Sequence, residues 1–163
     1  MLIGILSDSH GRHLPVRQAM ALFDKLGVEH VIHCGDIGGM EVFDEMLGRP
    51  LAFVWGNMDF PDMGLYAYLD TADLKPLDDG SPITQIGGKR IAVFHGHESL
   101  FHRAIEHLDV DYLFHGHTHV VRDERAGGKR IINPGALHRA ARKTVATLDV
   151  ELDKLIFHEI REG

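Results

Sequence analysis

The stretch Phe114-His115-Gly116-His117-Thr118-His119 follows a short apolar run, as a loop at the end of a buried strand would. If the backbone stays extended beyond that strand, residues two apart point to the same side, about 7 Å from each other along the chain. His117 and His119 would then present two imidazoles side by side. Two metal ions about 3.5–4 Å apart could take one imidazole each. A lone His-x-His pair is a weak signal, so its meaning depends on the residues upstream.

The bulk composition predicts one ordinary globular domain that spans residues 1–163. Of the 163 residues, 44% are hydrophobic and 25% are charged, which is enough apolar material for a substantial core. The formal net charge of −7 makes long nucleic acid an unfavourable partner, because no basic excess is available to neutralise its phosphates.

A cytoplasmic setting is expected from the cysteine content and from the first residues of the chain. Cys34 is the single cysteine and cannot form an internal disulfide, which fits a reducing compartment. The run Leu2–Leu6 has no basic region before it and reaches Asp8 at once, which is typical of a strand and not of a signal peptide. No segment is long and apolar enough to cross a bilayer, so no membrane partner is expected.

Strand-length apolar runs alternate with helical spacing in the first third of the chain. Strands are expected over 2–7, 30–34 and 51–55, and helices from Pro15 to Gly27 and over 40–47. This alternation is typical of a predominantly parallel α/β sheet, in which ligands bind beyond the carboxyl ends of the strands.

The later chain is expected to contain mostly β structure. The segment 60–82 is rich in Pro, Gly and Asp and is expected to be an irregular connection. A hairpin over 83–94 with Gly87-Gly88 at its turn should precede a helix over 100–108 and a strand over 112–114. Further strands are expected over 120–125, 129–133, 143–150 and 154–160.

Seven polar residues lie at the predicted strand ends: Asp8, His10, Asp36, Asn57, His95, His117 and His119. Three of them offer oxygen and four offer nitrogen, a mixture that suits Mn²⁺, Fe²⁺ or Zn²⁺ better than Mg²⁺ or Ca²⁺. The absence of thiolate ligands argues against a structural zinc site. Each residue alone has an ordinary alternative, such as a turn or a core histidine. Their joint occurrence at strand ends favours a metal centre.

The sequence also resembles a known family, in five blocks that occur in order: Asp8-x-His10, Gly35-Asp36, Gly56-Asn57-x-Asp59, His95-Gly96-His97 and Gly116-His117-x-His119. These resemble the signature blocks of the calcineurin-like metallophosphoesterases. The small size and the motif Asn133-Pro134-Gly135 resemble the compact bacterial and archaeal phosphodiesterase branch.

The resemblance implies an α/β fold, a four-layer α/β/β/α sandwich of two mixed β-sheets flanked by helices. It implies two metal positions with a shared carboxylate. One ion would take Asp8, His10, Asp36 and His119, and the second would take Asp36, Asn57, His95 and His117.

The charge balance of such a centre fits phosphate ester hydrolysis. Two divalent ions bring about four positive charges and Asp8 and Asp36 return about two, so the pocket stays cationic. A water shared by two metals is acidified toward neutral pH and can attack phosphorus in line with the leaving group. The expected protein is a phosphodiesterase that uses two divalent ions, Mn²⁺ before Fe²⁺, Zn²⁺ or Ni²⁺, on small phosphodiesters or nucleotides.

One position departs from the wider superfamily. Many members carry histidine between the asparagine and the acid of the third block, as a proton donor to the leaving group. This chain has Met58 there, which cannot donate a proton. His97 is the nearest alternative acid by sequence. Asp59 lacks the histidine that it would orient. Both residues are therefore only candidates for a catalytic role. Arg12 is the candidate substrate contact.

Four further residues have ordinary explanations as strand end or solvent-facing charge, but could support the site: His115, His138, Arg139 and Arg142. Two other functions stay open, a phosphomonoesterase or nucleotide phosphatase and a non-catalytic metal-binding scaffold on the same fold. The complete ligand set favours an enzyme, and Met58 favours diesters. A homo-oligomer through a sheet edge or through 60–82 also stays open.

Overall fold

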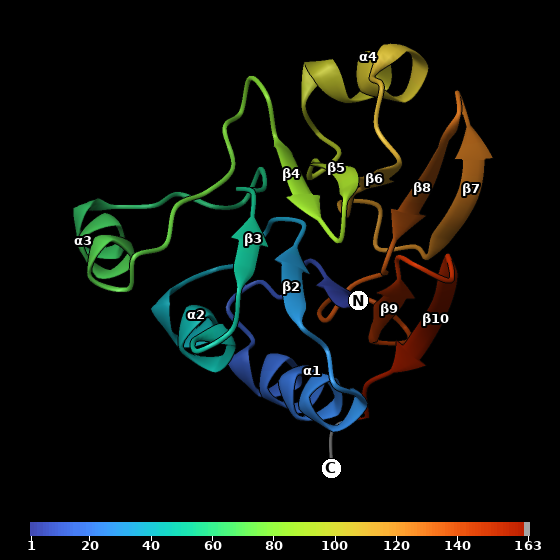
Figure 1. Ribbon diagram of the computed structural model, residues 1–163. Coiled ribbons are helices and arrows are strands. Elements are labelled where there is room, and N and C mark those ends of the chain that lie inside the picture. The colour runs from blue at the N-terminus through green and yellow to red at the C-terminus, as the bar shows by residue number, and fades with distance from the viewer. Residues whose placement is uncertain (162–163) are drawn as a thin grey trace.

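The structure is a computed structural model that describes residues 1–161. Four helices and ten strands follow one another in this part of the chain (Figure 1). In order they are β1 (Leu2–Leu6), α1 (His13–Leu26), β2 (His30–His33), α2 (Met40–Met46), β3 (Leu51–Phe53), α3 (Met63–Thr71), β4 (Ile83–Ile86), β5 (Lys89–Val93), α4 (Ser99–His107), β6 (Tyr112–Phe114), β7 (Arg122–Ala126), β8 (Lys129–Asn133), β9 (Thr144–Asp149) and β10 (Lys154–Glu159).

The strands form two five-stranded mixed sheets. The first has the order β10-β9-β1-β2-β3, and the second has the order β4-β5-β6-β8-β7. In each sheet three neighbouring strands are parallel, β1, β2 and β3 in the first and β5, β6 and β8 in the second. The remaining pairs are antiparallel. The parallel arrangement expected from the first third of the chain is confirmed for β1, β2 and β3, whereas each sheet as a whole is mixed because further strands pair with it antiparallel.

The hydrophobic core forms three clusters, one at each interface between the four stacked layers of helices and sheets. Alternate residues of β1 divide between them, because successive side chains of a strand point to opposite faces. Leu6 packs with α1 and α2, whereas Ile3 and Ile5 pack between the two sheets. A third cluster joins the outer face of the second sheet to α4. The α/β/β/α sandwich with two mixed sheets is confirmed, with α1 and α2 on one outer side and α4 on the other (Figure 1).

Aromatic side chains hold the first helical layer against its sheet. Phe23 of α1 lies over Gly4 of β1, where an added Cβ would approach the ring to 2.5 Å. Phe43 of α2 packs edge-on against Phe53 and Trp55, with ring centroids 5.0 and 6.0 Å apart. Edge-to-face pairs of this kind add stability beyond the buried area alone.

The segment 60–82 contains a helix that the sequence analysis did not predict. Asp62 caps α3 by accepting a hydrogen bond from the amide of Leu65 at 2.8 Å. Leu69 is buried against the first layer, and the hydroxyl of Tyr68 donates to Asp44 at 2.6 Å. The helix has only nine residues, and the Pro, Gly and Asp residues around it made the segment resemble an irregular connection in the sequence.

The other predicted elements are present, with ends displaced by one or two residues. The difference reaches two residues at three places: α1 begins at His13 and not at Pro15, β3 ends at Phe53 and not at Trp55, and β7 begins at Arg122 and not at Val120. No helix among residues 1–161 has both the length and the apolar character that a membrane span requires.

Replacing Phe43 by alanine should lower the free energy of unfolding by about 3–5 kcal/mol, because it removes a fully buried ring that touches two other aromatic rings. Urea unfolding followed by circular dichroism measures the change. The control is Leu152→Ala at a side chain that is 73% exposed, which should change stability by less than about 0.5 kcal/mol. Equal effects of the two substitutions would contradict this packing.

Candidate metal centre

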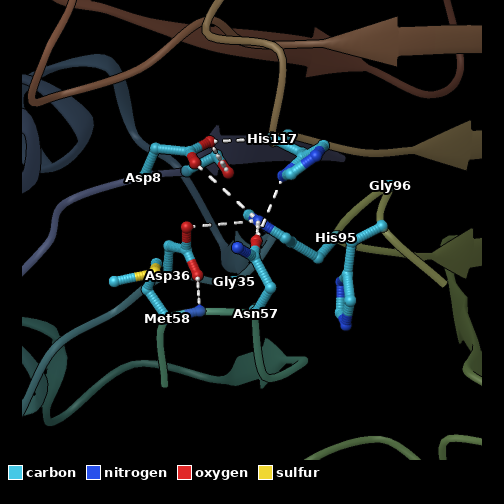
Figure 2. A network of polar contacts seen from close by, with 12 residues as sticks. Asp8, Gly35, Asp36, Asn57, Met58, His95, Gly96 and His117 are labelled. Atoms are coloured by element: carbon cyan, nitrogen blue, oxygen red, sulfur yellow. Dashed lines mark hydrogen bonds and ion pairs between the residues drawn. The ribbon is translucent and has the colours of Figure 1, made fainter.

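The seven predicted ligands come together at one edge of the sandwich, where loops from both sheets meet. Figure 2 labels five of them: Asp8, Asp36, Asn57, His95 and His117. The loops are tied to one another through their backbones. The amide of His10 donates to the oxygen of Asp36 at 2.9 Å, and that of Gly116 donates to the oxygen of His95 at 2.9 Å. Each loop follows the carboxyl end of a strand, as expected for an α/β ligand site.

The backbone at the ligands is not extended. Five ligands adopt left-handed φ values of 46° to 68°: Asp8, His10, Asp36, His117 and His119. Such values cost roughly 1–2 kcal/mol for an L-residue and tend to gather at functional sites. The expectation of an extended Gly116–His119 segment is wrong. His117 and His119 nevertheless both face the site, through these turns and not through strand alternation.

Two glycines permit the close approach of these loops. A Cβ added to Gly116 would lie within 2.6 Å of Asp8 Oδ2, and one added to Gly56 would lie 2.7 Å from Asp36 Cγ. Both positions therefore exclude any side chain. Each glycine lets a neighbouring loop reach the carboxylate beside it.

The two aspartates divide their oxygen atoms between two tasks. Asp8 Oδ2 accepts from Ser7 Oγ at 2.6 Å and from the His117 amide at 3.1 Å. Asp36 Oδ1 accepts from the Met58 amide at 2.8 Å. The other oxygen of each carboxylate faces the histidines. One oxygen thus fixes the orientation of the side chain, and the second remains available to a cation.

The first donor group contains Asp8, His10 and His119, whose donor atoms lie within 4.8 Å of one another. His119 Nε2 is 3.1 Å from Asp8 Oδ1. His10 Nε2 is buried and has no hydrogen-bond partner among residues 1–161, although it lies 3.7 Å from Asp8 Oδ1 and 3.6 Å from Asp36 Oδ2. A buried nitrogen with no partner, between two carboxylates, fits a metal ligand.

The second donor group lies on the other side of the same carboxylates. Asp8, Asp36 and His95 again place donor atoms within 4.8 Å of one another. Asn57 Oδ1 lies 2.9 Å from His95 Nε2 and 3.1 Å from His117 Nδ1. Dashed lines in Figure 2 mark these contacts. Asp8 is the carboxylate common to the two groups, whereas the family resemblance gives the shared position to Asp36, whose Oδ2 lies 3.6 Å from His10 Nε2 of the first group.

The protonation states that ligands need are set by the surrounding protein. The other ring nitrogen of His95, Nδ1, lies 2.8 Å from the oxygen of Cys34 and can only donate to it, which leaves Nε2 directed into the site. Burial acts to raise the pKa of Asp36, but hydrogen bonds from His95 and the Met58 amide outweigh it and hold the pKa at about 2. Asp36 is accordingly ionised at neutral pH.

Asp59 lies behind the site and connects two ligand loops. Its carboxylate accepts from the amides of Ile37 at 2.9 Å, Gly38 at 3.0 Å and Gly56 at 2.8 Å. Burial raises the pKa of Asp59 against these donors. The contacts give it a positioning role for the loops that carry Asp36 and Asn57.

Glu98 positions the loop after β5 in the same way, a role that the sequence pattern did not indicate. Its carboxylate accepts from the amides of His95 and Gly96, each at 2.7 Å. The available signal was an acidic residue directly before a helix and three positions after a ligand. His97 lies beside it, with Nδ1 3.8 Å from Glu98 Oε2 and its ring centroid 6.3 Å from that of His117.

His33 is a second missed residue, buried between the first two ligand loops. Its Nδ1 accepts from the amide of Gly35 at 3.2 Å, so Nε2 carries the hydrogen and donates to Ser9 Oγ at 2.9 Å. Ser9 in turn donates to the oxygen of Ile37 at 2.9 Å. This chain of hydrogen bonds joins the loop of Asp8 to the loop of Asp36.

His115 is also buried, in support of the loop that follows β6. Its Nε2 accepts from Arg122 at 3.3 Å and its Nδ1 donates to the oxygen of Gly116 at 3.0 Å. Burial lowers its pKa to about 4, so the ring is neutral. The remaining candidates lie at the rim. Arg12, Arg139 and Arg142 are exposed, and His138 is half-buried.

The buried state of His33 should make stability depend on pH. Burial lowers the pKa of His33 to about 3 from the ordinary value of 6.5. Below pH 6.5 the unfolded chain binds a proton that the folded protein does not, so the free energy of unfolding falls by about 1.4 kcal/mol per pH unit from this group. His33→Gln keeps a donor for Ser9 and should lose about 2 kcal/mol less than the wild type between pH 6.5 and 5.

This difference is measured by urea unfolding of the chelator-treated protein at several pH values. The matched control is His107→Gln on the exposed surface of α4. A His33→Gln protein with the same pH slope as the wild type would contradict the assignment of His33 as a buried neutral ring.

Comparison with known proteins agrees with the geometry of the centre. Residues 1–153 match the calcineurin-like phosphoesterase superfamily domain. The phosphodiesterase MJ0936 of Methanocaldococcus jannaschii is 32% identical over 157 residues, which are 93% of this chain and 94% of that protein. The probable metallophosphoesterase YsnB of Bacillus subtilis is 32% identical over 145 residues, 84% of this chain and 75% of that protein.

Solved structures show the same architecture. A structure described as a novel archaeal phosphodiesterase superposes with a TM-score of 0.86 at 29% identity, over 98% of this chain and 99% of that one. Vps29 of Entamoeba histolytica in complex with zinc has a TM-score of 0.66 at 22% identity, over 99% and 100% of the two chains, a likeness of fold alone. By its matched domain and its relatives, this chain belongs to the calcineurin-like phosphoesterase superfamily.

Proposed function

We propose that this protein is a phosphodiesterase that depends on two divalent metal ions and hydrolyses small phosphodiesters. The observation that carries the proposal is the arrangement around Asp8 and Asp36, each of which holds one oxygen by hydrogen bonds and turns the other toward histidines. Relatives named as phosphodiesterases, with about 30% identity over nearly the whole chain, support the same reaction class.

The donor set fits two ions of the Mn²⁺ type. One would be held by Asp8, His10, Asp36 and His119, and the other by Asp36, Asn57, His95 and His117. Mixed oxygen and nitrogen ligation favours Mn²⁺, Fe²⁺, Zn²⁺ or Ni²⁺ over Mg²⁺. When bound, the ions supply Lewis acidity toward the phosphate oxygens and lower the pKa of a coordinated water.

The residues of the chain supply orientation. Asp59 and Glu98 hold the ligand loops through backbone amides, and the His33 to Ser9 contact joins two of these loops. Such outer contacts set the position and basicity of ligands, and their removal typically costs 10–100-fold in metal affinity or activity, as an order of magnitude. The single Cys34 is fully buried, which accords with the cytoplasmic setting that we propose.

Removal of a shared ligand tests the function directly. Asp36→Asn should reduce Mn²⁺-dependent hydrolysis of bis(p-nitrophenyl) phosphate by at least about 100-fold and lower the bound metal per chain, since it weakens both positions. Kinetics with elemental analysis of the same samples measures both effects. The control is His107→Gln, which lies outside the centre. Two bound metals without turnover of any diester or monoester would contradict the enzyme and favour a metal-binding scaffold.

The proton donor is a separate proposal, since Met58 cannot serve. We propose His97, an exposed imidazole whose ring lies 5.4 Å from that of His95 and 6.3 Å from that of His117. His97→Ala should slow diesters with alkyl leaving groups about 10²–10⁴-fold and aryl diesters much less, because a phenolate leaves without a proton. Comparison of kcat/KM for the two substrate series measures the difference.

The complementary variant is Met58→His, which places an imidazole next to the ligand Asn57. In the His97→Ala background it should restore part of the activity on alkyl esters. Equal losses on aryl and alkyl esters in His97→Ala would show that this histidine only supports the loop.

A further inference from the structure

Positive charge that the ligand set does not use lies beside the first donor group. Arg12 follows His10 after β1, and His138 and Arg139 lie in the loop between β8 and β9. The ring of His138 lies edge-on to that of His10, with centroids 5.8 Å apart. The backbone oxygen of Arg139 is 3.2 Å from Nδ1 of His119. Both loops therefore border the centre on the same side.

Among residues 1–161 the two arginines have no counter-ion. In the part of the chain that the structure describes, residues 1–161, neither guanidinium group of Arg12 or Arg139 takes part in a hydrogen bond or ion pair. Arg17, only five positions after Arg12, is fully paired, since Glu45 accepts from it at 2.7 and 3.0 Å. An unpaired guanidinium offers a planar fork of donors that matches a phosphate group.

Arg12 is two residues from His10, and the backbone of Arg139 contacts His119, so both arginines belong to loops that border the first donor group. We call Arg12 and Arg139 the cationic rim.

The surface next to the rim has room for part of a ligand. Arg12 lines a cleft of about 550 Å³ that runs from Gly11 along the start of α1 to Gln18. Gly11, which lines this cleft, donates its amide to the oxygen of Ile37 in the loop that carries Asp36, at 2.8 Å, so the cleft adjoins that loop. A substrate whose scissile phosphate lies at the donor groups can therefore extend past Arg12.

We propose that the cationic rim binds a second phosphate group of the substrate, distinct from the phosphate that is cleaved. The inference deepens the proposed function and depends on it for the position of the scissile group. A substrate with a single phosphate leaves Arg12 and Arg139 without a partner. The substrate class is accordingly a small phosphodiester that carries a further phosphate, such as a phosphorylated nucleotide derivative.

Binding measured without turnover tests this inference. We compare thymidine 3′,5′-bisphosphate with thymidine 5′-monophosphate on the Mn²⁺-loaded protein by isothermal titration calorimetry. Charge-assisted contacts of this kind predict a preference for the bisphosphate of about 10–100-fold. Arg12→Gln and Arg139→Gln should each reduce the preference about 3–10-fold, and the double variant should bring it to within about twofold of unity. Arg139→Lys should restore part of it.

The matched control is Arg103→Gln, an exposed arginine on α4 that removes the same charge outside the cationic rim and should preserve the preference. A wild-type preference below about twofold, or an equal loss in Arg103→Gln, would overturn the proposal. If the wild-type protein prefers the bisphosphate but hydrolyses no phosphodiester, the result would count against the proposed catalysis and support the rim. The two failures are therefore distinguishable.

Discussion

Two carboxylates buried side by side are the constraint on which this structure depends. Asp8 is 0% and Asp36 is 3% exposed, and their oxygens lie within 4.8 Å of one another. Removal of each charge from water costs several kcal/mol, and their mutual repulsion adds to the cost. Hydrogen bonds from Ser7, from the His117 amide and from the Met58 amide offset part of it. The remaining negative charge faces histidines and is balanced fully only when cations are bound.

The two-sheet architecture follows from the need to surround these carboxylates. The first sheet supplies Asp8, His10, Asp36 and Asn57, and the second supplies His95, His117 and His119. Neither sheet alone contains a complete ligand set for both positions. Metal binding should therefore couple the two sheets, whose facing side chains form the central core layer. The left-handed φ values at Asp8, His10 and Asp36 persist because Asp59 and His33 fix these loops from behind.

Sequence patterns were sufficient for the ligands and insufficient for what holds them. The convergence of the seven candidate ligands was predictable because each stands where an apolar run ends, and strand ends of one sheet meet at one edge. His33 and Glu98 escaped because their roles depend on backbone amides that the sequence does not display. The helix α3 was hidden because its stability comes from the Asp62 cap and from Leu69 in the core, contacts made with few residues of its own.

The local geometry of the opening stretch shows the same limit. An extended backbone and a left-handed turn can both bring His117 and His119 to one site, and only the second occurs. The turn arises because Gly116 allows Ser7 and Asp8 to approach its Cα closely, a contact across more than a hundred residues. Periodicity describes neighbours along the chain, so it cannot anticipate a conformation imposed by a distant loop.

The surroundings of the centre are unequal, and this inequality bears on which phosphates reach it. The cationic rim lies beside the first donor group, whereas the half-exposed Met58 and the exposed Phe60 follow Asn57 of the second. The chain as a whole carries a net charge of −7, which repels a long polyanion at distances where the rim is screened. A small anion, by contrast, interacts with the rim and the bound cations at short range. The combination favours compact phosphate esters with one charged and one less polar end.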